Sequence, residues 1–207
     1  MKKYFESVGD VSQQHYLARM DEQLNRLAKL VSSLLDISRI KMGKLQYEKT
    51  YFDLTALAKQ IAQDIQSITT THVITVQGNR AYQVWGDADR IGQVLINLIT
   101  NAVKYSPDAK KVTIAVTPVA AGIKVSVRDY GLGVPKRHQA KIFERFYRVY
   151  DSKQQTFPGL GIGLYLSSEI VKHHQGKIGV TSKPKAGSTF YFILPTAKQE
   201  RRVKTKR

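Results

Sequence analysis

Cysteine is absent from this 207-residue sequence, and its absence excludes disulfide bonds and thiolate metal sites. The sequence also lacks an apolar run near the roughly 20 residues that a bilayer-spanning helix needs, and no signal-peptide core follows Met1. These absences predict a soluble chain that works in a reducing, cytoplasmic environment. The length allows one domain with an appendage or two small domains, and it is enough to bury a core.

Acidic residues are scarce: 16 Asp and Glu stand against 33 Lys and Arg, which gives a formal net charge of +17. Such a balance permits binding to nucleic acid or attraction to an anionic membrane surface. The basic residues are nevertheless spread along the chain, apart from a basic tail at 198–207, and no zinc-finger, RNA-recognition or basic-zipper pattern is present. We therefore expect no specific nucleic-acid partner.

Residues 10–44 have the apolar period of one long helix. Steps of three and four residues separate Leu17, Met20, Leu24, Leu27, Val31 and Leu34, and this stripe is widened by Leu30, Leu35, Ile37 and Ile40. Gly43 is a suitable stop for the helix. So broad an apolar face must be covered, by a second copy, by another helical segment or by the chain's own domain.

Residues 89–107 read D-R-I-G-Q-V-L-I-N-L-I-T-N-A-V-K-Y-S-P, and their apolar positions again have a helical period with one buried face. Asn97 and Asn101 lie four apart and therefore project from one side of this helix, and Lys104 and Tyr105 extend the same edge. Carboxamide oxygens can ligate Mg²⁺ and a lysine can bind phosphate, so this edge is a candidate site for a polar ligand. The alternative is a core helix with solvated asparagines.

Two glycine-rich stretches could complete such a site. In D-Y-G-L-G-V-P, Asp129 can accept a hydrogen bond from an exocyclic amine, while Gly131 and Gly133 would let the backbone approach a flat ligand. The alternative there is a simple Asp-Gly turn. In G-L-G-I-G-L, the glycines at 159–163 precede an apolar helix whose free N–H groups can face phosphate. The spacing is not the dinucleotide fingerprint, and no P-loop is present.

The remaining periodicity predicts both strands and helices. The strands are expected at 45–53, 72–77, 82–86, 111–117, 122–129, 177–182 and 188–194, and the helices at 54–68 and 159–175. This mixture lacks the regular β-α-β alternation of a doubly wound fold. We therefore predict an α+β fold in which helices pack on one face of a mixed sheet, preceded by the long helix.

Four motifs together resemble those of bacterial sensor histidine kinases, a branch of the GHKL superfamily of ATP-binding proteins. N-L-I-T-N-A-V-K-Y (97–105) resembles the asparagine box, D-Y-G-L-G-V-P (129–135) the first glycine box, I-F-E-R-F-Y-R (142–148) the phenylalanine box and G-L-G-I-G-L (159–164) the second glycine box. They follow the family's order and separations. The resemblance implies a Bergerat-type α/β sandwich at 45–197 as a catalytic ATP-binding domain, after a partial dimerisation and histidine-phosphotransfer helix at 1–44.

The resemblance also implies ATP and Mg²⁺ as cofactors. In the family's pattern Asn101 ligates Mg²⁺, and Asn97 either assists or contacts phosphate directly. Lys104 and the glycine loop hold the phosphates. Tyr105 would lie against the base or ribose, and Asp129 would accept from the adenine amine. The implied nucleotide-binding residues are Asn97, Asn101, Lys104, Tyr105, Asp129, Gly131, Gly133, Gly159, Leu160, Gly161, Gly163, Leu164 and Thr189.

The phenylalanine box leads into a polar segment that, in the family, forms a lid over the nucleotide. Arg145 and Arg148 stand where this lid begins and could meet the γ-phosphate, so with Asn97 and Lys104 they are the candidate catalytic residues. The alternative is that both arginines are solvated. Phe143 and Phe146 are expected to be packing anchors for the lid.

The implied activity is that of a protein-histidine kinase. No histidine here fits the family's phosphoacceptor pattern, and all five are expected to be structural or solvated. The γ-phosphate would therefore pass to a histidine not present in this chain, and then to an aspartate of a response-regulator receiver domain. Asn97 stands where related ATPases have a glutamate, and an amide cannot act as a general base, so ATP hydrolysis should be slow.

Partners and alternatives follow from the same resemblance. We expect a homodimer through the helix at 10–44, membrane contact only through segments outside this chain, and no autophosphorylation by the isolated chain. A protein-serine kinase of the anti-sigma type would share the ATP site but lack the long helix. A nucleotide-binding pseudo-kinase, or a basic binding module without phosphotransfer activity, is the other alternative.

Overall fold

The computed structural model describes residues 11–43, 46–149 and 160–196, which divide between two compact units, 1–45 and 46–207. In the part of the chain that the structure describes, none of the helices combines the length and the hydropathy of a membrane-spanning segment.

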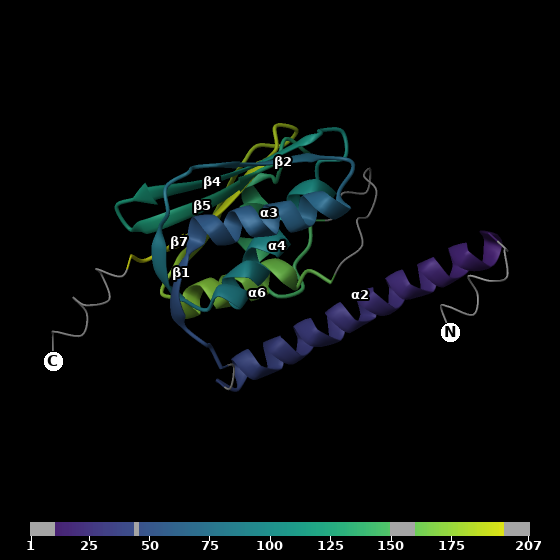
Figure 1. Cartoon of the computed structure of the whole chain (residues 1–207), viewed down its shortest axis with the longest axis horizontal. Helices are drawn as coiled ribbons and strands as arrows, with labels where there is room; N and C mark the ends of the chain where they lie inside the picture. The colour runs from purple at the N-terminus through teal and green to yellow at the C-terminus, as the bar shows by residue number, and fades with distance from the viewer. Residues whose placement is uncertain (1–10, 44–45, 150–159, 197–207) are drawn as a thin grey trace. The chain divides into compact units, whose positions relative to one another are not determined.

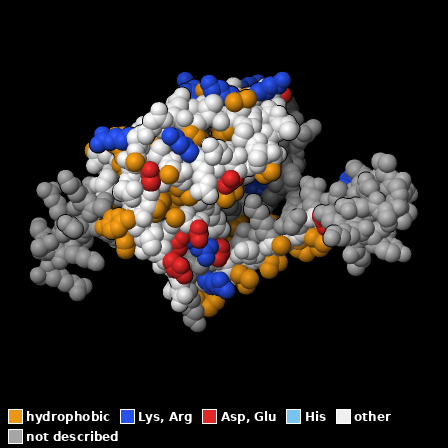
Figure 2. All heavy atoms as spheres, in the orientation of Figure 1, with side chains coloured by type: hydrophobic (Ala, Val, Ile, Leu, Met, Phe, Trp, Pro, Cys, Tyr) orange, Lys and Arg blue, Asp and Glu red, His pale blue; other side chains and the backbone are white. Residues whose placement is uncertain are grey.

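The first unit contains one long helix where the sequence predicts it. This helix, α2 (Val11–Lys41), is followed by Gly43, which has a φ of 64° and donates its amide to the carbonyl of Ile40 at 3.0 Å. Figure 2 shows hydrophobic side chains along α2, and the heptad-like positions Met20, Leu24, Leu27, Val31 and Leu34 are between 45% and 62% exposed. These five positions of the predicted apolar stripe are therefore open to solvent, whereas Ile37, which widens the stripe, is 5% exposed.

The second unit is built on a five-stranded sheet with the order β2-β4-β5-β7-β6 (Figure 1). Its strands are β2 (Val73–Gln77), β4 (Lys111–Val119), β5 (Gly122–Arg128), β6 (Lys177–Ser182) and β7 (Ser188–Leu194). β2 pairs with β4 in parallel, and the other pairs are antiparallel. The helices α3 (Leu54–Ile68), α4 (Ala88–Lys104) and α6 (Gly163–His173) lie on one face of this sheet. The predicted class, helices on one face of a mixed sheet, is confirmed.

Shorter elements join the large ones. β1 (Thr50–Asp53) and β3 (Gln83–Gly86) form a separate antiparallel pair, and α5 (Lys136–Gln139) and the 3-10 turn η1 (Lys141–Phe143) follow β5. Asp53 links β1 to α3, because its Oδ1 accepts from the amide of Thr55 at 2.8 Å and from that of Tyr82 at 3.2 Å. This side chain caps α3 and also fixes the approach to β3.

Alternation along the strands and the helical period of α4 produce one shared core. On β5, Ile123, Val125 and Val127 are buried against the helices, whereas Lys124 and Arg128 lie on the other face. The buried face of α4 carries five side chains that are 0% exposed: Ile91, Val94, Leu95, Leu98 and Ile99. Burial of each such side chain stabilises the fold by about 1.5–3 kcal/mol. The polar edge of α4 is therefore carried on a firmly anchored helix.

The outer edge of β2 is covered by a side chain from α3. Gln66 Oε1 accepts from the amide of Ile74 at 2.8 Å, and Gln66 Nε2 donates to the carbonyl of His72 at 3.1 Å and to that of Thr69 at 2.9 Å. The Gln66 carboxamide thus satisfies backbone groups that a further strand would otherwise use.

Two predicted boundaries are wrong by four or five residues. The helix predicted at 159–175 begins at Gly163, because Gly161 takes a left-handed φ of 69° that interrupts any earlier turn. The strand predicted at 45–53 begins at Thr50. The described residues before it, 46–49, are held by contacts to other elements, such as the bond from the Glu48 amide to the Asp87 carboxylate at 3.0 Å, and do not join a ladder.

Candidate functional site

The polar edge of α4 has fixed ends. Asp87 is the N-cap of the helix, with its Oδ1 accepting from the amide of Arg90 at 3.0 Å. The helix ends at Lys104, and the chain after it is tied back, since His72 Nε2 lies 2.9 Å from the carbonyl oxygen of Ser106. His72 is 4% exposed, and this bond gives it a structural role, as the sequence predicts.

The two asparagines of α4 lie against the start of α6. Asn97 Nδ2 donates to Ser167 Oγ at 2.9 Å, and Asn101 Nδ2 donates to Asn97 Oδ1 at 3.4 Å. Both bonds use the amide nitrogens as donors. The acceptor of the second amide, Asn101 Oδ1, is not used by this pair, and it is a suitable ligand for a hard cation.

The second glycine box packs on these asparagines and on the phenylalanine box. A Cβ on Gly163 would lie 2.4 Å from Asn97 Oδ1, and one on Gly161 would lie 2.7 Å from the carbonyl oxygen of Tyr147. The Gly161 carbonyl accepts from the amide of Phe146 at 3.0 Å. Among the described residues, no side chain caps the N-terminus of α6, so the N–H groups of its first turn can face an anion beside Asn97.

Asp129 lies at the end of β5 and is 3% exposed. Its Oδ1 accepts from the amides of Gly131 at 2.9 Å and Ser188 at 3.1 Å, and neither bond uses Oδ2. Burial raises the pKa of this carboxyl, and the two amide hydrogen bonds oppose that rise. A half-satisfied, buried carboxylate of this kind can accept one hydrogen bond from a ligand amine.

The glycines of the first glycine box are required by contacts within the chain. A Cβ on Gly131 would lie 2.0 Å from the carbonyl oxygen of Tyr105, and that carbonyl accepts from the amide of Leu132 at 3.1 Å. Gly133 has a φ of 70°, and its Cβ would lie 2.0 Å from the carbonyl oxygen of Lys183. The box is therefore fastened to the end of α4 on one side and to the β6–β7 turn on the other. The predicted close approach to a ligand stays a prediction.

The edge of α4 ends in a cationic and aromatic group. Lys104 Nζ lies 5.0 Å from the centroid of the Tyr105 ring, and Tyr105 is 38% exposed. Burial raises the pKa of the Tyr105 phenol, and the positive charge of Arg148 partly opposes this rise. Arg148 therefore lies near enough to Tyr105 for the two side chains to interact electrostatically. Arg145 is exposed and has its guanidinium 5.1 Å from the ring centroid of Phe146.

Only one of the two expected lid anchors is packed. The ring of Phe143 meets that of Phe190 with the centroids 6.5 Å apart. Phe146 is 54% exposed with a φ of 64°, so the prediction that it packs as an anchor is wrong. The left-handed backbone at Phe146 turns the side chain outward.

Other predicted residues fall around this group. Leu160 is 43% exposed, Leu164 is half-buried on α6, and Thr189 is half-buried on β7 opposite Arg128. Gly159 lies outside the described residues. Ser167 was not predicted, although its position one helical turn after Gly163 is a signal that could have found it.

Comparisons with known proteins give this geometry a context. A family model described as "Histidine kinase-, DNA gyrase B-, and HSP90-like ATPase" matches residues 86–198. The chain is 30% identical over 97% of its length to the sensor histidine kinase WalK of Bacillus subtilis (strain 168), of which it spans 34%.

Solved structures show the same similarity. Full-length ShkA, in complex with AMPPNP, matches with a TM-score of 0.75 and 26% identity, over 91% of this chain and 40% of ShkA. The fold is also similar to that of histidine kinase ThkA in its complex with response regulator TrrA, with a TM-score of 0.68 and 24% identity, over 92% of this chain and 53% of that one. In each case the chain spans only part of the larger protein.

Proposed function

Because the chain belongs to the family of histidine kinase-, DNA gyrase B- and HSP90-like ATPases, we propose that it is the ATP-binding catalytic part of a sensor histidine kinase. In this role it binds Mg-ATP along α4 and presents the γ-phosphate to a histidine. The phosphoryl group then passes to an aspartate of a response regulator. Support comes from WalK, a sensor histidine kinase, and from ThkA, whose solved complex contains a response regulator.

One observation carries the proposal: residues from four separate motifs meet along α4. Gly163 of the second glycine box packs on Asn97, and Gly131 of the first glycine box packs on the carbonyl of Tyr105. Arg148 of the phenylalanine box acts on the Tyr105 phenol. Contacts between segments this far apart in sequence support one shared site that comprises an amide pair, a lysine, a buried carboxylate and the N-terminus of α6.

The donor set fits a magnesium nucleotide. Asn101 Oδ1 would hold Mg²⁺, and the first N–H groups of α6 with Lys104 would hold the phosphates. Asp129 Oδ2 would accept from the adenine amine and so select the base. The cation would supply neutralisation of charge on the phosphates, which phosphoryl transfer requires.

The same residues favour transfer over hydrolysis. Asn97 donates to Ser167 and accepts from Asn101, and its neutral amide cannot take a proton from water. The site therefore positions and neutralises the phosphates without activating a nucleophile. The nucleophile comes from the acceptor protein, where a histidine is nucleophilic in its neutral form.

The first test is calorimetric titration of Mg-ADP into the chain at physiological salt. We expect saturable binding that Asn101→Ala weakens at least about tenfold, because the variant loses the proposed metal ligand. The matched control is Asn79→Ala, since Asn79 is exposed and bonds only to Lys59 Nζ at 3.3 Å in the described structure. No heat in the wild type, or equal heat in all three proteins, would contradict the proposal.

The transfer step needs a separate measurement. A longer form of the protein that carries a phosphoacceptor histidine is incubated with Mg²⁺ and [γ-³²P]ATP, and the label is tested for acid lability and alkali stability. We expect phosphohistidine that is lost in Asn101→Ala. Steady release of inorganic phosphate without labelled protein would instead indicate a hydrolase.

A further inference from the structure

The helices α4 and α6 both contribute to the proposed nucleotide site, and they are pinned to each other at both ends. At the site end, Asn97 Nδ2 donates to Ser167 Oγ at 2.9 Å, and Gly163 packs on Asn97. At the other end, the amide of Asp87, the N-cap of α4, donates to Nε2 of His174, the C-cap of α6, at 2.9 Å. The second pin has no part in ligand binding.

The chemistry of this second pin is fixed by burial. His174 is 3% exposed, and its Nδ1 lies 2.7 Å from the carbonyl oxygen of Ile170, which can only accept. Nδ1 therefore carries the proton, and the lone pair of Nε2 accepts the hydrogen bond from the Asp87 amide. Gly86 leaves space for the ring, because a Cβ there would lie 2.7 Å from Cδ2 of His174.

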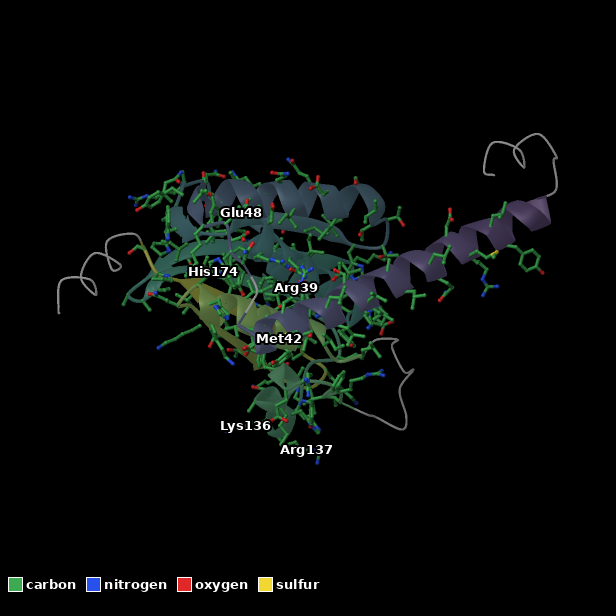
Figure 3. All side chains as sticks on the ribbon, turned by 90° about the horizontal axis from the view of Figure 1, so that it is seen from below. Arg39, Met42, Glu48, Lys136, Arg137 and His174 are labelled. Carbon is green, nitrogen blue, oxygen red and sulfur yellow. The ribbon has the colours of Figure 1, made fainter. Side chains whose placement is uncertain are left out.

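The segment that precedes β1 is fastened to the same place. The Glu48 amide donates to Asp87 Oδ2 at 3.0 Å, and Lys49 Nζ donates to the carbonyl of His173 at 3.1 Å. Glu48 and His174 are labelled in Figure 3. These bonds form one joint, buried at the His174–Asp87 contact, which holds the start of α4, the end of α6 and the start of the second unit.

We propose that His174 is a positioning residue for the nucleotide site. By accepting a hydrogen bond from the Asp87 amide, His174 fixes the axial position of α4 relative to α6. This position in turn determines where Asn97 and Asn101 lie relative to the glycine loop. Ten residues separate Asp87 from Asn97, about 15 Å of helix, so a shift at the joint is carried to the site by a rigid element. This inference rests on the proposed function, since it concerns the same nucleotide site.

The joint is expected to respond to pH. The pKa of His174 is lowered, chiefly by burial and further by the charges of Lys49 and His173. The hydrogen bond to Ile170 and the charge of Asp87 act in the opposite direction and raise this pKa. The ring of Tyr47 also faces the imidazole. A lowered folded-state pKa means that the acceptor is fully present above the ordinary value of 6.5 and is lost as pH falls through the folded-state pKa. Protonation at Nε2 removes the lone pair that the Asp87 amide needs.

The test compares His174→Gln, which keeps an acceptor but does not titrate, with His174→Leu, which has no acceptor. Mg-ADP affinity is measured by calorimetry from pH 5 to 8, with circular dichroism at each pH. We expect His174→Leu to lose about tenfold in affinity while folded, and His174→Gln to stay within about threefold of the wild type at pH 8. On acidification the wild type should lose affinity relative to His174→Gln, so the ratio of the two affinities should fall. Protonation of the nucleotide affects both proteins equally and therefore cancels in this ratio.

Two further variants keep the test decisive. Gly86→Ala presses on the ring without removing the acceptor and should lower affinity even if His174→Leu does not fold. His173→Gln, which keeps both the carbonyl that Lys49 uses and the His174 acceptor, should match the wild type at pH 8. Wild-type affinity in His174→Leu and Gly86→Ala, or a flat ratio across pH, would overturn the positioning role. Absence of binding in the wild type would instead overturn the proposed function.

Discussion

Replacement of Gly163 by alanine should separate nucleotide binding from stability. The new Cβ would lie 2.4 Å from Asn97 Oδ1 and 3.0 Å from Asn97 Cγ, so the Asn97 side chain must move by about 1 Å. That movement costs the hydrogen bond to Ser167, which contributes about 1 kcal/mol. Alanine in place of glycine stabilises a protein by about 0.4–1 kcal/mol where it suits the backbone, because it restricts the unfolded chain. The two effects offset each other, and the free energy of unfolding should change by less than about 1 kcal/mol.

The affinity for nucleotide should change far more than the free energy of unfolding. A hydrogen bond to a charged group is worth about 1.5–3 kcal/mol, so a displaced Asn97 should lower the affinity for Mg-ADP by at least about tenfold. The assay is calorimetric titration beside urea unfolding of the same preparations. Gly92→Ala on α4 is the matched control, because its Cβ would lie 3.3 Å from Ile61 Cδ1 and 4.0 Å from Leu57 Cδ1, which are the ends of flexible side chains. Wild-type affinity in Gly163→Ala would refute a contribution of Asn97 to nucleotide binding.

Three further predictions concern the rest of the site and the long helix. Asp129→Asn should lower affinity for Mg-ADP at least about tenfold in calorimetry, because an amide N–H donor can replace the oxygen proposed to accept from the adenine amine. Burial raises the pKa of Asp129, so wild-type affinity should also fall on acidification as this carboxylate is protonated. Gly131→Ala should lower the free energy of unfolding in urea by about 1–3 kcal/mol or more, because its Cβ would lie 2.0 Å from the Tyr105 carbonyl oxygen and only backbone could yield. The whole chain should be a dimer in light scattering and residues 46–207 alone a monomer; a monomeric whole chain would contradict pairing through the exposed stripe of α2.

The fold was predictable wherever the pattern is local. The period of α4 placed Asn97 and Asn101 on one edge, and the alternation on β5 placed Asp129 at a strand end. The start of α6 was mispredicted because residues 159–175 look helical in sequence, while the left-handed φ of Gly161 depends on packing against Tyr147. Sequence periodicity carries no information about such a contact.

Contacts between distant segments were beyond the sequence. The exposure of Phe146 follows from a backbone torsion that the aromatic pattern does not encode. His174 was expected to be structural or solvated, and the structure shows it to be structural, but its partner Asp87 lies 87 residues away in the chain. The contact between Gly131 and the Tyr105 carbonyl, which requires glycine at 131, likewise joins segments that are distant in sequence. Only the folded chain brings these groups together.

The Gln66 carboxamide on the outer edge of β2 has a consequence for the behaviour of this protein at high concentration. Sheets with open edges can join edge to edge and grow into fibrils. Here a single amide from α3 occupies the first backbone positions that an incoming strand would seek, and the opposite edge strand, β6, is flanked by Lys177 and Lys183. Both borders of the sheet thus discourage recruitment of a neighbouring molecule. Gln66→Leu would uncover one border, and its folded form should polymerise sooner than the wild type in thioflavin fluorescence.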